Sequence, residues 1–284
     1  MDVNSQRDWF APLLSSDAFM GSLMLAARLL MTGIFIYYIY NLMVRMQSPA
    51  ALIWFIIAAQ ALGIVLVVLG YQTRFAALLL AACILASLWF RSGLDFHNFL
   101  VTISEKDLAI AGGFLFMFAS GPGSLSVDGR LGAGSSRTGE ENSMGPLLLT
   151  GRIFMVFVFL YFGVSKILHT AEVEAFMTRH NPHVPLNLVY LAILVQIIPP
   201  LMVLFGYKTR YGVVILAGFC IIAPSLFHSE FGNRSEVEHF FLDFAICGGF
   251  LFLFAQGPGP ISVDAWRARS KNAAAEKQTL PVGA

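Results

Sequence analysis

Several titratable side chains stand at helical spacing near the ends of long apolar runs in the second half of the chain. Lys166 and His169 are three residues apart and His239 and Asp243 are four apart, so each pair would share one helix face. A histidine beside a carboxylate one turn away can relay a proton near neutral pH. Lysine and histidine can also donate hydrogen bonds to a quinone carbonyl or an anionic headgroup. The pattern predicts a binding site for a quinone or similar lipid-soluble molecule, made by Lys166, His169, Gln196, His228, Glu238, His239 and Asp243.

Two other interpretations of these polar residues stay open. A metal site would use the ligand-type residues His228, Glu230, Glu238 and His239. Their spacing, however, matches no specific metal motif. A solvated loop with ordinary interfacial anchors would need no ligand at all. The sequence contains no haem, flavin or iron–sulfur motif, so a redox partner protein would have to supply any electrons, and whether the chain is an enzyme stays undecided.

The composition is that of a polytopic membrane protein. Hydrophobic residues make up 57% of the chain and charged residues only 12%, whereas soluble domains carry about twice that charge. A net charge of +1 gives no reason to expect nucleic acid, and the lipid bilayer is the expected partner. Continuous apolar runs without alternation favour helices over strands. Eight runs approach the length of a membrane span, at residues 21–44, 50–70, 74–91, 105–120, 147–168, 187–206, 210–227 and 239–256.

The chain is internally duplicated. The stretch Ala109–Asp128 recurs 136 residues later as Ala245–Asp264, with 15 of 20 positions identical. The first helix of each unit aligns at an offset of 124, so the second unit has 12 extra residues between its first two helices. Four helices per unit is an even number, so both units face the same way. The prediction is an all-α integral membrane protein whose eight transmembrane helices form two parallel four-helix bundles related by a pseudo-twofold axis.

The duplication divides the chain. An N-terminal cytoplasmic or interfacial segment (1–20) precedes repeat one (21–128), a flexible Gly/Ser-rich linker (129–146), repeat two (147–264) and a polar tail expected to be disordered (265–284). Lysine and arginine favour the side with both termini by ten to six, which predicts that both termini are cytoplasmic. The polar residues of repeat two then lie at the outer face.

Two arginines lie at equivalent positions inside predicted spans. A charge inside a span costs about 2.5–3.5 kcal/mol on insertion scales and normally has a partner. We expect Arg28 to pair with Asp128 and Arg152 with Asp264, because each aspartate would lie at the same end of its repeat. The alternative is that each arginine reaches a lipid phosphate. The Gly-Pro-Gly before each aspartate is expected to end the fourth helix, with its first glycine in a left-handed cap.

The second repeat resembles a DoxX protein. The resemblance rests on four motifs: Gly151-Arg152, Phe162-Gly-Val-Ser-Lys166, Gly206-x-x-Thr-Arg210 and Gly257-Pro-Gly-x-x-Ser-Val-Asp264. The first repeat is similar but lacks the Gly-x-x-Lys, so the whole chain resembles a tandem DoxX/DoxD-like protein. The resemblance implies four-helix bundles in the bacterial cytoplasmic membrane and relatives that include a subunit of thiosulfate:quinone oxidoreductase. Many members carry glutamate where this chain has Gln60 and Gln196.

The sequence therefore favours a membrane subunit of a quinone-linked oxidoreductase system, with repeat two as the binding unit and repeat one mainly as scaffold. A noncatalytic scaffold or assembly protein that anchors a partner is the alternative. A small-solute transporter is a weaker one. It is motivated by Pro199-Pro200, which should kink or break the sixth span.

Overall fold

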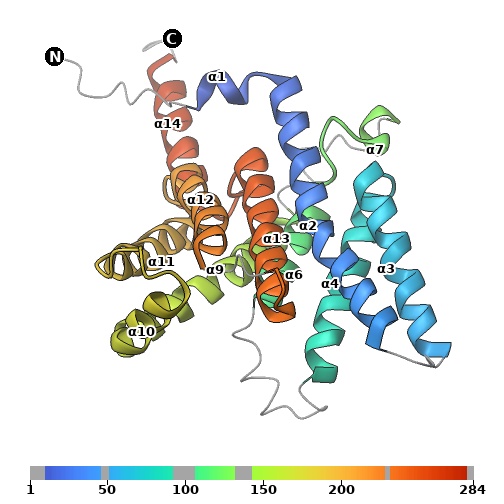
Figure 1. Ribbon diagram of the computed structural model, residues 1–284. Coiled ribbons are helices and arrows are strands. Elements are labelled where there is room, and N and C mark those ends of the chain that lie inside the picture. Colours follow the sequence, from blue (N-terminus) through green and yellow to red (C-terminus); the bar gives the residue numbers. More distant parts are fainter. Residues whose placement is uncertain (1–9, 46–50, 92–105, 132–142, 228–230, 280–284) are drawn as a thin grey trace, which may run out of the picture.

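A computed structural model describes residues 10–45, 51–91, 106–131, 143–227 and 231–279, and within these ranges the only regular structure is helical. Repeat one supplies α2 (Asp17–Arg45), α3 (Ala51–Leu69), α4 (Thr73–Arg91) and α6 (Asp107–Ser120). Repeat two supplies α9 (Gly145–Leu168), α11 (Leu188–Phe205), α12 (Thr209–Phe227) and α13 (Arg234–Gln256). Four further helices are α1 (Ala11–Leu14), α7 (Val127–Arg130), α10 (Thr170–His180) and α14 (Val263–Thr279) (Figure 1).

The helices coincide with the predicted apolar runs, and the prediction of an all-helical membrane protein is confirmed. Among the described residues, five helices are long and apolar enough to cross a membrane, namely α2, α9, α11, α12 and α13. Shorter apolar stretches lie in α3, α4 and α6.

The first helix of each repeat packs mainly against the last helix of the other repeat. α2 lies along α13 and α9 along α6, and α6 and α13 also contact each other (Figure 1). A Cβ added at Gly112 would lie 2.7 Å from the carbonyl oxygen of Gly151, and one at Gly248 would lie 2.7 Å from that of Ala27. Glycine therefore permits both close crossings. Because these contacts join different repeats, the repeats are interlocked, and neither closes on itself as a separate bundle.

At the end of the molecule that carries α7 and α14, each buried arginine binds the segment that follows the last helix of its repeat. The Arg28 guanidinium donates a hydrogen bond to the carbonyl of Leu125, and that of Arg152 donates to the carbonyl of Ile261. Arg152 also donates to the carbonyl of Val203 at 3.3 Å. Both arginines are 0% exposed, so neither reaches a lipid phosphate. Each arginine thus ties its loop to the helices.

The aspartates of the same loops cap helices. Asp128 accepts hydrogen bonds from the backbone N–H groups of Gln72 and Thr73, both at 2.9 Å, at the start of α4. Asp264 makes the equivalent bonds at the start of α12. Within the described ranges no direct ion pair joins either aspartate to a buried arginine, so the predicted contacts Arg28–Asp128 and Arg152–Asp264 do not form. The charge of each aspartate still acts on the arginine of its own repeat from a distance. The carboxylate instead meets the positive end of a helix dipole and its free N–H groups.

Glycines shape the turns around this network. Gly70 and Gly206 have φ of +69° and +67°, and a Cβ at Gly206 would lie 2.6 Å from the guanidinium of Arg152. Gly121 and Gly257 end α6 and α13 with φ of +83° and +80°. Their ψ angles are close to 180°, so they are not the left-handed caps that we expected. The backbone leaves the helix in an extended direction, which carries it over the arginine.

The C-terminal tail differs from the prediction. Residues Val263–Thr279 form α14, so the expected disorder of 265–284 is wrong as far as Thr279. The segment is too polar to form a core, but it is rich in Ala, Lys, Glu and Arg, which favour helix. The middle of the predicted linker, residues 132–142, lies outside the described residues.

Repeat two contains an additional helix, α10, and an uninterrupted α11. The 12-residue insertion contains α10, which packs against α9 and α11. Pro199 and Pro200 lie inside α11, which continues through both of them as one helix. The interrupted helix that motivated a transporter is therefore not present in α11.

Candidate functional site

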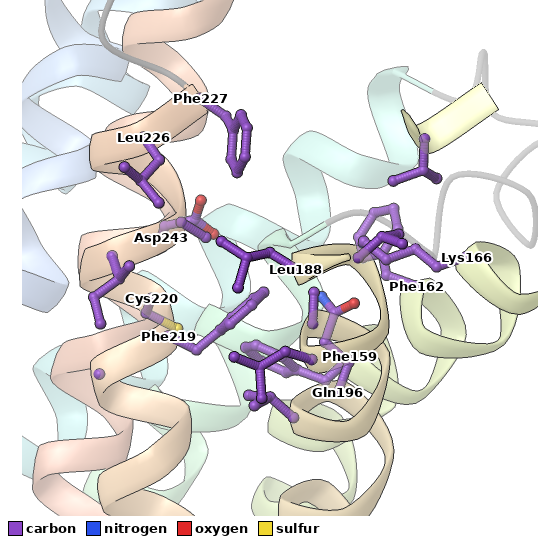
Figure 2. A pocket seen from close by; sticks show the side chains of 18 of the residues that line it. Phe159, Phe162, Lys166, Leu188, Gln196, Phe219, Cys220, Leu226, Phe227 and Asp243 are labelled. Atoms are coloured by element: carbon purple, nitrogen blue, oxygen red, sulfur yellow. The ribbon is translucent and has the colours of Figure 1, made fainter. Parts of the chain in front are cut away.

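A cavity of about 640 Å³ lies within repeat two, between α9, α10, α11, α12 and α13 (Figure 2). Its walls are mostly apolar and include Phe159 and Phe162 from α9, Leu188 from α11 and Phe219 from α12. Figure 2 shows the side chains of Phe159, Phe219 and Gln196 among those that line the cavity. Ligand sites in proteins are typically apolar cavities of roughly 300–1,000 Å³ with a few polar groups, so this cavity has the size and lining for an organic ligand.

Two glycines determine the shape of the cavity. A Cβ added at Gly218 of α12 would meet no atom within 4 Å, because this residue faces open space. Gly163 of α9 has the opposite role. A Cβ there would lie 2.7 Å from the side chain of Ile197 and 3.1 Å from the carbonyl oxygen of Gln196. Glycine at 163, where repeat one has Ile39, therefore allows α11 to approach α9 and places Gln196 at the cavity wall.

The insertion of repeat two forms part of the wall. Val173, Phe176 and Met177 of α10 line the cavity. The polar side chains of α10, such as those of Glu172 and Arg179, are exposed. Because the first repeat is shorter by these residues, α10 is a wall that repeat one cannot supply.

A salt bridge between the repeats borders the cavity. Lys106, just before α6 of repeat one, lies 2.7 Å from the carboxylate of Asp243 on α13. The two side chains are only 18% and 12% exposed, and both residues line the cavity. Lys106 is not among the site residues predicted from the sequence. The available signal was the repeated aspartate, Asp107 and Asp243, but the partner lies 137 positions away in the other repeat.

The buried amide oxygen of Gln196 has no hydrogen-bond partner among the residues that the structure describes. Gln196 is 5% exposed, and it lines the cavity. Gln60, its equivalent in repeat one, is 2% exposed, and its buried amide oxygen likewise lacks a partner within the described part of the chain. An unsatisfied buried amide normally costs free energy, so it points to a missing partner. In repeat two the adjacent cavity provides room for one.

Lys166 lies at the end of α9, where it also lines the cavity. Its ammonium stands 5.5 Å from the centre of the Phe162 ring, a cation–π distance. The charges of Lys106 and Asp243 are close enough to act on it. In the part of the chain that the structure describes, Lys166 has no salt bridge of its own.

The structure brings together four of the seven predicted site residues: Lys166, Gln196, His239 and Asp243 all line the cavity. His169 lies outside it, exposed, with its ring nitrogen 3.5 Å from Glu172. Glu238 is on the same helix as Asp243 but is not a lining residue, and His228 lies outside the described residues. No group of three metal-ligand side chains occurs among the residues that the structure describes.

In repeat one the equivalent aspartate, Asp107, has a different hydrogen-bond donor. The hydroxyl of Tyr38 donates a hydrogen bond to Asp107 at 2.6 Å, within the same repeat. In repeat two the position of Tyr38 is occupied by Phe162, which cannot donate. Asp243 therefore has no equivalent tyrosine hydroxyl and binds Lys106 of the other repeat.

In comparison with known proteins, the two halves of the chain match separate family models. The DoxX family model matches residues 147–229, and the SURF4 family model matches residues 5–131. The inner membrane protein YqjF of Escherichia coli is 35% identical over 117 residues, which cover 41% of this chain and 88% of that protein. The inner membrane protein YphA of the same organism is 24% identical over 123 residues, or 42% of this chain and 88% of that protein. No solved structure matches the chain.

Proposed function

Because the chain belongs to the DoxX family, we propose that it is a multi-pass subunit of a quinone-linked oxidoreductase system in the bacterial inner membrane. Both relatives named above are inner membrane proteins, and one repeat of this chain corresponds in length to one such relative. In this proposal all eight apolar helices span the bilayer. The repeats are parallel and related by a pseudo-twofold axis, and both termini are cytoplasmic. The recurrence of the arginine and aspartate contacts in both repeats supports this arrangement.

The cavity with two separated polar groups on one wall carries the proposal. Gln196 is level with Gly163, since its carbonyl oxygen lies 3.1 Å from the position of a Cβ there. Lys166 is three residues further along α9, so the two side chains start about one helical turn, roughly 5 Å, apart. A quinone has two oxygens on opposite sides of a flat ring. One oxygen would accept a hydrogen bond from Lys166. The other, as the hydroxyl of the reduced quinol, would donate one to the amide oxygen of Gln196, with the ring between Phe159, Phe162 and Phe219.

Proton transfer would use the residues on α13. His239 and Asp243 both line the cavity and are one turn apart, an arrangement suited to moving a proton to or from a bound quinone. His169 and Glu238 would belong to the outer rim rather than to the cavity wall. The chain's own residues offer no redox group for electron transfer, so the proposal includes a redox partner protein that delivers or removes the electrons.

A titration with a fluorescent or quenching quinone analogue tests the proposal. Purified wild-type protein in nanodiscs should bind the analogue saturably, and Lys166→Ala and Gln196→Leu should each weaken binding about tenfold, the effect of one lost hydrogen bond of about 1.4 kcal/mol. Lys208→Ala is the matched control, because Lys208 also stands over an aromatic ring, Tyr207, but outside the cavity. If the wild type shows no saturable binding, or if both cavity variants bind normally, the quinone proposal is wrong and a noncatalytic scaffold explains the family resemblance better.

A further inference from the structure

The charges around the cavity do not balance. The described residues that line it include two lysines, Lys106 and Lys166, and one carboxylate, Asp243. The other ionisable groups among these lining residues are His239 and the Cys220 thiol. Lys106 and Asp243 neutralise each other at 2.7 Å. Lys166 is left as an excess cation at the edge of an apolar space, where water cannot fully screen it.

The excess charge lies beside the unsatisfied amide. The buried oxygen of Gln196 has no partner in the described ranges, and the residue is one helical turn deeper than Lys166 along the same wall. A ligand that only filled the apolar space would leave both groups uncompensated. A ligand with an ionised oxygen at Lys166 would compensate the excess charge. A hydrogen-bond donor about one turn deeper on the ligand would in addition satisfy the amide oxygen of Gln196.

The apolar part of the cavity opens toward the bilayer. Several lining residues on α11 and α12 are themselves exposed: Leu191 at 54%, Ile215 at 45% and Ile222 at 59%. These side chains would face lipid in a membrane protein. An alkyl chain could therefore leave the cavity between these helices while the polar head stays near the end of α9.

From these three observations we propose that the cavity selects an amphiphile whose head carries one ionised oxygen, with Lys166 as its counter-charge. The inference rests on the proposed ligand cavity and narrows the class of ligand. Two sources share this chemistry, an acidic hydroxyquinone with an alkyl chain and a long-chain fatty acid. Lys106 acts as a specificity residue from repeat one, because by neutralising Asp243 it leaves the charge of Lys166 free to bind the anion.

Two matched pairs of probes test the proposal at neutral pH. One pair is an alkylated hydroxynaphthoquinone and its neutral methoxy analogue. The other is a long-chain fatty acid and its methyl ester. The wild type in neutral-lipid nanodiscs should bind the anion of at least one pair roughly tenfold more tightly than its neutral analogue. Lys166→Met should abolish the preference, because it weakens binding of the anion more than binding of the neutral analogue, whereas Lys208→Met should keep the preference.

Lys106→Met provides a second variant with a different prediction. Removing this lysine leaves Asp243 unneutralised, so the preference for the anion should also disappear although Lys166 is intact. Equal binding of anion and neutral analogue by the wild type overturns the inference but leaves the quinone proposal standing. Selective binding of the fatty acid alone supports the inference and overturns the quinone proposal. Absence of binding by all four probes overturns both.

Discussion

The two repeats are nearly the same at one end and different at the other. At the end with α7 and α14, Arg28 and Arg152 bind equivalent carbonyls, and Asp128 and Asp264 cap equivalent helices. At the opposite end, Asp107 is bound by a tyrosine of its own repeat and Asp243 by a lysine of the other. Duplication has kept the network that holds each repeat together and has changed the end where the cavity lies.

The difference shows how a duplicated scaffold can acquire one specialised site. Only repeat two combines Gly163, Lys166 and α10, and these three features respectively position Gln196, add a charge and close a wall. Because the repeats are interlocked, repeat one also contributes directly, through Lys106. The repeats are therefore not simply a scaffold and a site, since the site uses both.

The largest effects should follow from removing the buried arginines. Arg28→Met and Arg152→Met should each lower the free energy of unfolding by about 3 kcal/mol or more, since each leaves buried carbonyls without a charged donor. Thermal unfolding of the detergent-solubilised variants would measure this. Similar losses in both repeats support the equivalence of the two ends, whereas a stable Arg152→Met variant would contradict it.

The turn glycines should come next. Gly70→Ala and Gly206→Ala should each cost about 2 kcal/mol, because alanine disfavours positive φ and its Cβ would collide with the arginine. Gly218→Ala is the control within a helix. It should change stability by less than about 1 kcal/mol, and in the stabilising direction. Equal thermal stability of Gly206→Ala and Gly218→Ala would show that the turn is not constrained as described.

Removing the aspartate caps should have a moderate effect. Asp128→Ala and Asp264→Ala should each cost about 1–2 kcal/mol, the usual worth of a helix cap. The same thermal assay applies, with Asp→Asn as the conservative variant. The two N–H groups bond to different carboxylate oxygens, so asparagine keeps an acceptor for only one of them and should recover part of the loss. If asparagine were as harmful as alanine, a single accepted N–H bond would contribute nothing, which would contradict the cap.

The smallest effect is expected from the residues that make the surroundings of Asp107 and Asp243 different. Tyr38→Phe should cost about 1 kcal/mol because Asp107 loses a hydrogen bond, and the reciprocal change Phe162→Tyr should stay within about 0.5 kcal/mol of the wild type. Comparison of the two midpoints of unfolding measures the asymmetry. Equal changes would mean that Asp107 and Asp243 have equivalent surroundings after all.

The helices and the duplication could be read from the sequence because both depend on local pattern. Apolar runs of sufficient length predicted the helices, and the offset between copies located the insertion. Contacts between distant segments could not be predicted. The packing of α2 on α13 depends on Gly248 meeting Ala27, and the partner of Asp243 comes from 137 residues away. The sequence indicated that Asp264 lies near Arg152. It did not indicate that the N–H groups at the start of α12 would take the carboxylate of Asp264 as their acceptor, so the prediction gave Arg152 the wrong direct partner.

The most direct test is what the protein retains when it is purified in mild detergent and analysed by native mass spectrometry. Gly218→Phe should fill the cavity, since a Cβ at this position meets nothing within 4 Å. Ala82→Phe is the matched control, because Ala82 is the equivalent residue of repeat one and is exposed. The account predicts one lipid-soluble molecule bound to the wild type and to Ala82→Phe, and none bound to Gly218→Phe. A wild-type protein without any bound molecule, or a Gly218→Phe variant that retains it, would contradict the account.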